Sequence, residues 1–183
     1  LCSVLVFFCM DNDWLLDLYL TNYVEYSLEE TPCCGDQKTN RRAYCDPDFF
    51  TGAEDHLFHN LGNWIFKDVS VSSGIAPQKG KGLGVIPADF DKDGDLDLYI
   101  VNNPGPLAQK LTDMSARNVL YRNNGDGTFT NVTQSAGVAN GDKVGAGASF
   151  LDIDRDGYLD LFVANYVEFS CADNVKRTVR GFP

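Results

Sequence analysis

The chain has 183 residues, 44% of them hydrophobic, so it can form a substantial core, and this composition argues against wholesale disorder. Its formal net charge of -11, without a stripe of Lys and Arg alternating with aromatic residues, argues against a nucleic-acid partner. The apolar run around residues 4–8 extends for only about ten residues, roughly half a bilayer span, so we predict no transmembrane segment. Because the chain begins at Leu1 and residues 178–183 form no evident terminal element, we expect it to be a fragment.

Residues 1–25 are predicted to be the end of a repeat. Residues 11–25 align without a gap with residues 154–168, so the apolar run at 4–8 falls where the last repeat should have a buried strand. The acidic loop that recurs later in the chain is incomplete here, because Cys9 replaces its first Asp and Trp14 replaces its turn glycine. We expect the remaining carboxylates of this loop to bind metal weakly or not at all; they are Asp11, Asp13 and Asp17.

Residues 26–56 are predicted to form a polar, Cys-containing insertion. The adjacent Cys33 and Cys34 lack a Cys-x-x-Cys partner pair, so the spacing fits no zinc ribbon. A disulfide between Cys34 and Cys45 would close a loop of about a dozen residues and stabilise the fold by roughly 3 kcal/mol. Such a bond favours a secreted or cell-surface protein, whereas unpaired buried thiols remain the alternative. No pairing is predicted for the other cysteines, Cys2, Cys9, Cys33 and Cys171.

Two full repeats are predicted at residues 57–103 and 118–166. They align without a gap over most of their length, with Asp89 falling on Asp152. Aromatic and β-branched residues recur between glycine-rich turns, which predicts four strands in the later repeat, at 118–123, 128–133, 147–152 and 159–165. Four strands per repeat predict an all-β fold, a β-propeller fragment of about two full four-stranded blades plus a partial N-terminal one.

Further insertions are predicted at residues 104–117, between the two repeats, and at 167–183, where the next one begins. Residues 106–114 could hold a short helix. Insertions between repeats usually emerge on one face, so the insertions at 26–56 and 104–117 are candidate binding loops, with plain solvated connections as the alternative.

Each full repeat contains an acidic loop with Asp at loop positions 1, 3, 5 and 9. If the chain turns sharply at the glycine in position 6, these carboxylates converge, and the backbone carbonyl of position 7 can complete the oxygen shell that Ca²⁺ prefers. The predicted side-chain ligands are Asp89, Asp91, Asp93 and Asp97 in the 89–97 loop and Asp152, Asp154, Asp156 and Asp160 in the 152–160 loop, assisted by the carbonyls of Asp95 and Tyr158. An EF-hand is excluded, because Ile100 and Val163 replace its bidentate Glu. An acidic solvated turn without metal is the alternative.

These loops, with the Gly-x-Gly segments at Gly82 and Gly145 and the turn at residues 124–129, resemble FG-GAP/VCBS repeats, which are known from integrin α-subunit propellers. Asn22-Tyr-Val-Glu25, Cys34-Gly-Asp36 and Tyr44-Cys45-Asp-Pro47 further resemble the cartilage acidic protein group, whose members carry an ASPIC/UnbV domain after the propeller. No sequence of that domain is present in this chain. The resemblance implies a calcium-stabilised propeller, usually extracellular, that mediates adhesion or contacts a protein or glycan.

The sequence predicts a binding role rather than catalysis. His56 and His59 are the only histidines and so the first candidates for a general base, but on a predicted strand their spacing places them on opposite faces. There is no Gly-x-Ser-x-Gly motif and no phosphate-binding glycine loop. The alternative is part of a propeller enzyme, a polysaccharide lyase or hydrolase with structural calcium, and a third reading is a structural spacer.

Overall fold

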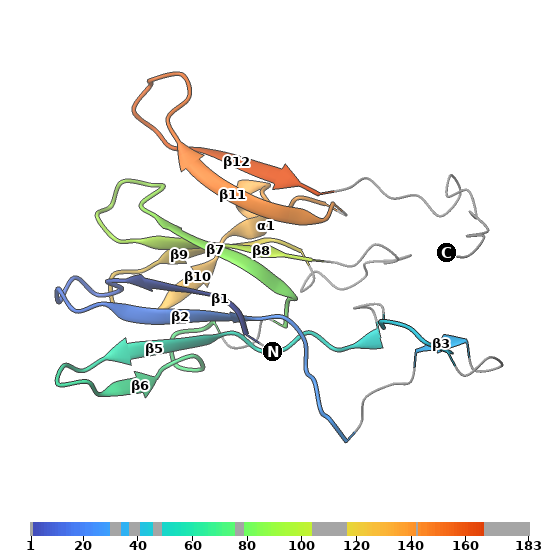
Figure 1. The fold of residues 1–183 in the computed structure, drawn as a ribbon. Coiled ribbons are helices and arrows are strands. Elements are labelled where there is room, and N and C mark those ends of the chain that lie inside the picture. Colours follow the sequence, from blue (N-terminus) through green and yellow to red (C-terminus); the bar gives the residue numbers. More distant parts are fainter. Residues whose placement is uncertain are drawn as a thin grey trace.

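The computed structural model describes residues 2–29, 34–36, 41–45, 49–75, 79–103, 117–141 and 143–166. Its main elements are antiparallel sheets that stack side by side (Figure 1). The first blade contains, in spatial order, β1 (Cys2–Phe8), β2 (Asp17–Asn22), β5 (His56–Asn60) and β6 (Phe66–Asp68). The second blade contains β7 (Gly82–Ala88), β8 (Asp97–Asn102), β9 (Val119–Asn123) and β10 (Phe129–Asn131). The third blade pairs β11 (Gly145–Leu151) with β12 (Asp160–Asn165).

The predicted all-β fold with two four-stranded blades is confirmed. Each of these blades takes two strands from one sequence repeat and two from the next, because β8 pairs with β9 across the insertion at 104–117. The N-terminal copy likewise completes its blade with β5 and β6, where Tyr19 lies opposite Leu57. The incomplete sheet of the described residues is therefore the C-terminal one, whereas the sequence pattern placed the partial blade at the N-terminus.

Two apolar layers hold the blades together. The layer between the first and second blades contains Phe8, Met10, Tyr19, Leu57, Val69, Ile75, Val85, Leu98, Ile100, Val119, Tyr121 and Phe129. The layer between the second and third blades is built on Tyr99, Val101 and Leu120, with side chains of β11 and β12 packed against them. All six residues of β8 are buried, because this strand has a blade on each side. The second blade is therefore the centre of the stack (Figure 1).

The Cys-containing insertion is tethered by a disulfide and by backbone pairing. Cys34 and Cys45 are joined, with their Cα atoms 5.1 Å apart, so the predicted disulfide is confirmed. Beside it, β3 (Gly35–Asp36) pairs with β4 (Arg41–Arg42). At the base of the insertion the N–H of Glu25 donates to the carbonyl of Thr51 at 2.9 Å. The insertion is thus fixed both within itself and where it leaves the first blade.

One short helix departs from the predicted strands. The sequence predicted a strand over 128–133, but β10 ends at Asn131 and α1 (Thr133–Ala136) follows. The N–H of Leu120 donates to Thr133 Oγ1 at 2.8 Å, so this side chain turns the chain back toward β9. The helix considered at 106–114 and the insertion at 167–183 lie outside the described residues. Among the described residues, no helix has the length and apolar character to cross a membrane.

Candidate metal sites

The 89–97 loop connects β7 to β8, and the pairing of these strands brings its two ends together. Ala88 lies opposite Asp97, so the carboxylates of positions 1 and 9 start from neighbouring points of the backbone. Between them the chain reverses through two left-handed residues, Lys92 with a φ of 63° and Gly94 with a φ of 95°. The 152–160 loop, between β11 and β12, has left-handed residues at the same two positions.

Three carboxylates converge in each loop. Their oxygen atoms lie within 4.8 Å of one another, a spacing that one cation at about 2.3 to 2.6 Å from each oxygen can bridge. The two groups are Asp89, Asp91 and Asp97, and Asp152, Asp154 and Asp160. The structure thus brings together three of the four predicted carboxylates in each loop.

The carboxylates at position 5 stand outside these groups and brace the turn. Asp93 Oδ1 accepts the N–H of Asp95 at 2.9 Å, and Asp156 Oδ1 accepts the N–H of Tyr158 at 2.7 Å. Such Asx turns fix the backbone two residues further on. Position 5 therefore orients the residue whose carbonyl was predicted as a ligand.

An enclosed carboxylate oxygen without a partner marks both groups. Among the described residues, Asp89 Oδ1 and Asp152 Oδ1 accept no hydrogen bond. The Oδ2 atoms accept the N–H of the position 6 glycine, at 3.1 Å in the 89–97 loop and 3.0 Å in the 152–160 loop. A buried polar atom without a partner is unfavourable by about 1 to 3 kcal/mol, and by more when it is charged. A cation among the three carboxylates would remove this penalty, so the residues present fit a Ca²⁺ ion.

The electrostatics of the 89–97 loop also favour a cation. Asp97 is 1% exposed, and burial raises its pKa to about 6, with the charges of Asp91 and Asp93 contributing; backbone N–H donors act in the opposite direction. Burial and the charge of Asp93 raise the pKa of Asp91 as well. The loop therefore holds more negative charge than its own hydrogen bonds compensate, and a bound cation would relieve this.

Comparison with known families matches two segments, residues 45–100 and 111–163, to the FG-GAP-like repeat. The chain belongs to the FG-GAP-like repeat family. The two segments cover more than half of the chain, and each contains one of the acidic loops that hold three converging carboxylates. The resemblance predicted from the sequence is confirmed.

The chain is also a distant homologue of cartilage acidic protein 1. The Homo sapiens protein is 31% identical over 105 residues, which are 57% of this chain and 14% of that protein. The Mus musculus protein is 28% identical over 138 residues, 75% of this chain and 19% of that protein. The Xenopus tropicalis protein is 28% identical over 114 residues, 61% of this chain and 16% of that protein. The chain thus spans less than a fifth of the length of these relatives.

The 9–17 loop of the first blade has a different donor set. His59 Nε2 lies 3.1 Å from Asp11 Oδ2, close enough for an ion pair but not aligned for a hydrogen bond. The sequence did not reveal this contact, because the two residues are far apart in the chain. His56 instead approaches Asp68, with 3.3 Å between Nδ1 and Oδ2, so the two histidines have different partners, as their strand spacing predicted. The ligand atoms that converge in this loop belong to Cys9, Asp11 and Asp13.

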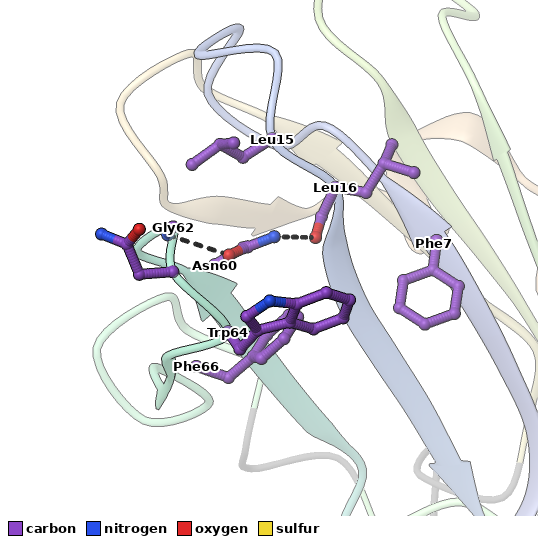
Figure 2. Close-up of a pocket in the computed structure, with 8 residues that line it drawn as sticks. Phe7, Leu15, Leu16, Asn60, Gly62, Trp64 and Phe66 are labelled. Atoms are coloured by element: carbon purple, nitrogen blue, oxygen red, sulfur yellow. Dashed lines mark hydrogen bonds between the residues drawn. The ribbon is translucent and has the colours of Figure 1, made fainter.

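An open apolar pocket beside the 9–17 loop was not predicted from the sequence (Figure 2). Its volume is about 470 Å³. The hydrogen bonds drawn in Figure 2 join the side-chain amide of Asn60 to the backbone. Asn60 Nδ2 donates to the Leu16 carbonyl at 3.0 Å, and the Gly62 N–H donates to Asn60 Oδ1 at 2.9 Å. The pocket is lined by Phe7, Leu15, Leu16, Asn60, Gly62, Asn63, Trp64 and Phe66. It therefore offers an apolar surface rather than reactive groups.

Proposed function

We propose that this chain is a calcium-binding FG-GAP-like module of a secreted or cell-surface protein, and that it serves binding rather than catalysis. The observation that carries the proposal is the pair of three-carboxylate groups. Each group has an enclosed oxygen that lacks a hydrogen-bond partner among the described residues. Because the same arrangement recurs in two successive blades, an accidental gathering of surface acids is a poor explanation for it.

Calcium suits these groups better than a transition metal, because every donor in them is an oxygen. Ca²⁺ takes about six to eight oxygen ligands in a flexible geometry, whereas Zn²⁺ and Cu²⁺ favour His and Cys. The side chains that would hold it are Asp89, Asp91 and Asp97, and Asp152, Asp154 and Asp160, with Asp93, Asp156 and the carbonyls of Asp95 and Tyr158 as further candidates. Bound calcium would supply positive charge between two strands and so stabilise the loop.

An extracellular protein or glycan is the proposed partner, and the Cys-containing insertion is the proposed contact region. The disulfide between Cys34 and Cys45 supports an oxidising compartment. Near it, Tyr44 and Phe49 are exposed aromatic side chains, a residue class that contributes strongly to binding interfaces. The homology to cartilage acidic protein 1 is consistent with this role and does not identify the partner.

Isothermal titration of the metal-free chain with calcium tests the proposal. Two sites are expected. Asp91→Ala and Asp154→Ala should each remove one site, while Asp11→Ala, the matched substitution at position 3 of the 9–17 loop, should leave both. A chain that binds no calcium, or that binds it equally well after the first two substitutions, would refute the calcium proposal.

A propeller enzyme, such as a polysaccharide lyase or hydrolase, is the second candidate, and one observation favours it. A pocket of about 590 Å³ is lined by Asp55, His56 and Lys67 among others, and burial raises the pKa of Asp55 to about 6, as in many general acids. Against this, Asp55 Oδ1 accepts the Asn22 N–H at 2.8 Å and Oδ2 accepts the Tyr19 hydroxyl at 2.9 Å, so both oxygens are engaged. Turnover of a polysaccharide that Asp55→Asn abolishes would establish this candidate.

A further inference from the structure

Loop position 4 carries a left-handed residue with a side chain in all three loops. Asn12, Lys92 and Arg155 have φ values of 61°, 63° and 65°. This backbone conformation is unfavourable for residues other than glycine, and less readily adopted by Lys and Arg than by Asn. Its recurrence is therefore a feature of the loop rather than of one side chain. In both blade interfaces that the structure describes, the side chain at position 4 reaches the loop of the next blade.

The residue that it reaches is position 7 of that next loop. Asn12 Nδ2 donates to Asp95 Oδ1 at 2.6 Å, and Lys92 Nζ lies 3.9 Å from the centre of the Tyr158 ring. A Cβ atom placed on Gly157 would come within 3.3 Å of Lys92 Nζ, so the ammonium group approaches the backbone of the loop as well as the ring. One contact is a hydrogen bond and the other is a cation–π contact, but the positions that they connect are the same.

Position 7 is a place where a neighbouring blade can influence metal binding. Its N–H is held by the position 5 carboxylate, at 2.7 Å in the case of Tyr158 and Asp156, and its carbonyl is a candidate ligand. A side chain anchored from the preceding blade restrains the same residue from its other end. Position 7 therefore connects the carboxylate group of its own loop with position 4 of the loop before it.

We propose that the calcium sites of successive blades are coupled through this contact between position 4 and position 7. The inference rests on the proposed function, because it requires that the loops bind calcium. Calcium in the 89–97 loop restrains the backbone at Lys92, and Lys92 then holds Tyr158. The 152–160 loop therefore loses less conformational freedom when it binds its own ion. Such coupling is reciprocal, so calcium in either loop raises the affinity of the other by the same factor.

The expected coupling is small, because the contacts that carry it are exposed. An exposed cation–π contact is strong enough to shift an equilibrium about two- to fivefold. Repulsion between two bound ions acts in the opposite direction and does not depend on the contact. The experiment therefore has to separate the contact from the charges.

Calorimetric calcium titrations of the whole chain in two backgrounds achieve this separation. Tyr158→Phe keeps the ring that Lys92 faces, Tyr158→Leu removes it, and neither substitution changes the net charge. Since Tyr158 is 60% exposed, neither is expected to unfold the blade. Asp91→Ala empties the 89–97 loop. The resulting decrease in the calcium affinity of the 152–160 loop should be about two- to fivefold larger in the Tyr158→Phe background than in the Tyr158→Leu background.

A second variant tests the other interface. Asn12→Gly keeps a left-handed residue at position 4 and deletes the amide that contacts Asp95. The calcium affinity of the 89–97 loop should fall, and that of the 152–160 loop should fall less, since its own contact with Lys92 is intact.

The outcomes distinguish the coupling from the proposed function. If both loops bind calcium but Asp91→Ala has the same effect in the Phe and Leu backgrounds, the coupling is refuted and the calcium-binding function stands. If the unsubstituted chain binds no calcium, the first titration refutes the function and the coupling together.

Discussion

The 9–17 loop of the first blade and the 89–97 loop of the second blade follow the same backbone course. Both have left-handed residues at positions 4 and 6. In both, the Asp at position 9 is buried and accepts the N–H of position 2 and the N–H of the Asn that ends the third strand of the blade. The loop is therefore shaped by Asp17 and Asp97 together with the strand pairing.

The two loops differ at the positions that decide metal binding. Cys9 stands where the second blade has Asp89, and Trp14, with a φ of 69°, stands where it has Gly94. The first blade therefore has the same loop shape with only part of the ligand set. Positions 1 and 6 thus differ between the blades while position 9 is the same, so substitutions can test the ligand set and the loop shape separately.

The largest effect is expected from removing calcium. At a free calcium concentration about 100 times the dissociation constant, one site stabilises the fold by about 2.7 kcal/mol, so two sites contribute roughly 5 kcal/mol. Chelation should therefore lower the melting temperature by roughly 10 to 20 °C, as measured by scanning calorimetry. The fall in melting temperature on chelation should be about half as large in Asp154→Ala as in the parent chain. In Asp11→Ala, the matched substitution in the first blade, it should be unchanged. A loss on Asp11→Ala as large as on Asp154→Ala would mean that the 9–17 loop also binds calcium.

Once calcium is removed, position 9 should matter equally in the two blades. Asp17→Ala and Asp97→Ala each leave two backbone N–H groups without an acceptor, which should lower the free energy of unfolding by about 2 to 4 kcal/mol. Urea denaturation in the presence of a chelator measures this. If Asp97→Ala destabilised the chain only when calcium is present, Asp97 would act as a ligand alone and would not determine the loop shape.

The blades also differ just before the third strand, where Asp55 of the first corresponds to Asn118 of the second. Both side chains accept a backbone N–H, from Asn22 at 2.8 Å and from Asn102 at 2.9 Å. Burial raises the pKa of Asp55 to about 6, above the unfolded value of about 3.9. The stability that this carboxyl contributes is therefore complete below about pH 4 and is lost as the pH rises through about 6.

Asp55→Asn removes the titrating carboxyl, so the variant should not lose this stability as the pH rises. It also makes the first blade resemble the second at this position. Relative to the unsubstituted chain, the variant should gain about 2 to 3 kcal/mol of unfolding free energy between pH 4 and pH 7.5. Chemical denaturation at the two pH values measures the difference. If the unfolding free energies of the variant and the unsubstituted chain differed by the same amount at pH 4 and at pH 7.5, the pH-dependent role assigned to the Asp55 carboxyl would be contradicted.

The smallest effect concerns position 6 and has opposite signs in the two blades. Trp14 is left-handed, so Trp14→Gly should stabilise the chain by about 1 kcal/mol. Gly94→Ala should destabilise it by a similar amount for the same conformational reason, since among the described residues no atom lies within 4 Å of a Cβ placed there. Thermal unfolding of both variants in chelator, compared with the parent chain, gives the two signs. If both substitutions changed the stability in the same direction, side-chain contacts rather than φ would determine the effect of position 6.

The features that could be predicted from the sequence have their determinants close together in the chain. The turn from Asp89 to Asp97 contains its own glycine and its own carboxylates, so the convergence of Asp89 and Asp91 was foreseeable. Cys34 and Cys45 are 11 positions apart and belong to one insertion. The strands could be predicted because aromatic and β-branched residues alternate with turn residues within each repeat.

The features that could not be predicted depend on contacts between distant segments. A repeat fixes the length of the unit but not where a blade begins. That β8 and β9 share a sheet follows only from the structure, where Leu98 lies opposite Tyr121. The approach of His59 to Asp11 and of Lys92 to Tyr158 likewise depends on how strands and blades assemble. No periodicity within one repeat carries that information. The carboxylates at position 5 stand outside the converging groups for a local reason, because Asp93 and Asp156 bond to the backbone two residues on. Their role as ligands stays a prediction.

Both tryptophans of the chain, Trp14 and Trp64, lie at loop tips of the first blade, where they are 94% and 97% exposed. Indole fluorescence of this protein therefore reports on one blade, and on the one least equipped to hold calcium. Its emission should be that of a solvated indole and should hardly respond to the ion. Tyr158, by contrast, occupies position 7 of the 152–160 loop, where it can pass excitation energy to a luminescent lanthanide such as Tb³⁺ bound in place of calcium. Indole emission and Tb³⁺ luminescence sensitised by Tyr158 would thus observe opposite ends of the row of described blades.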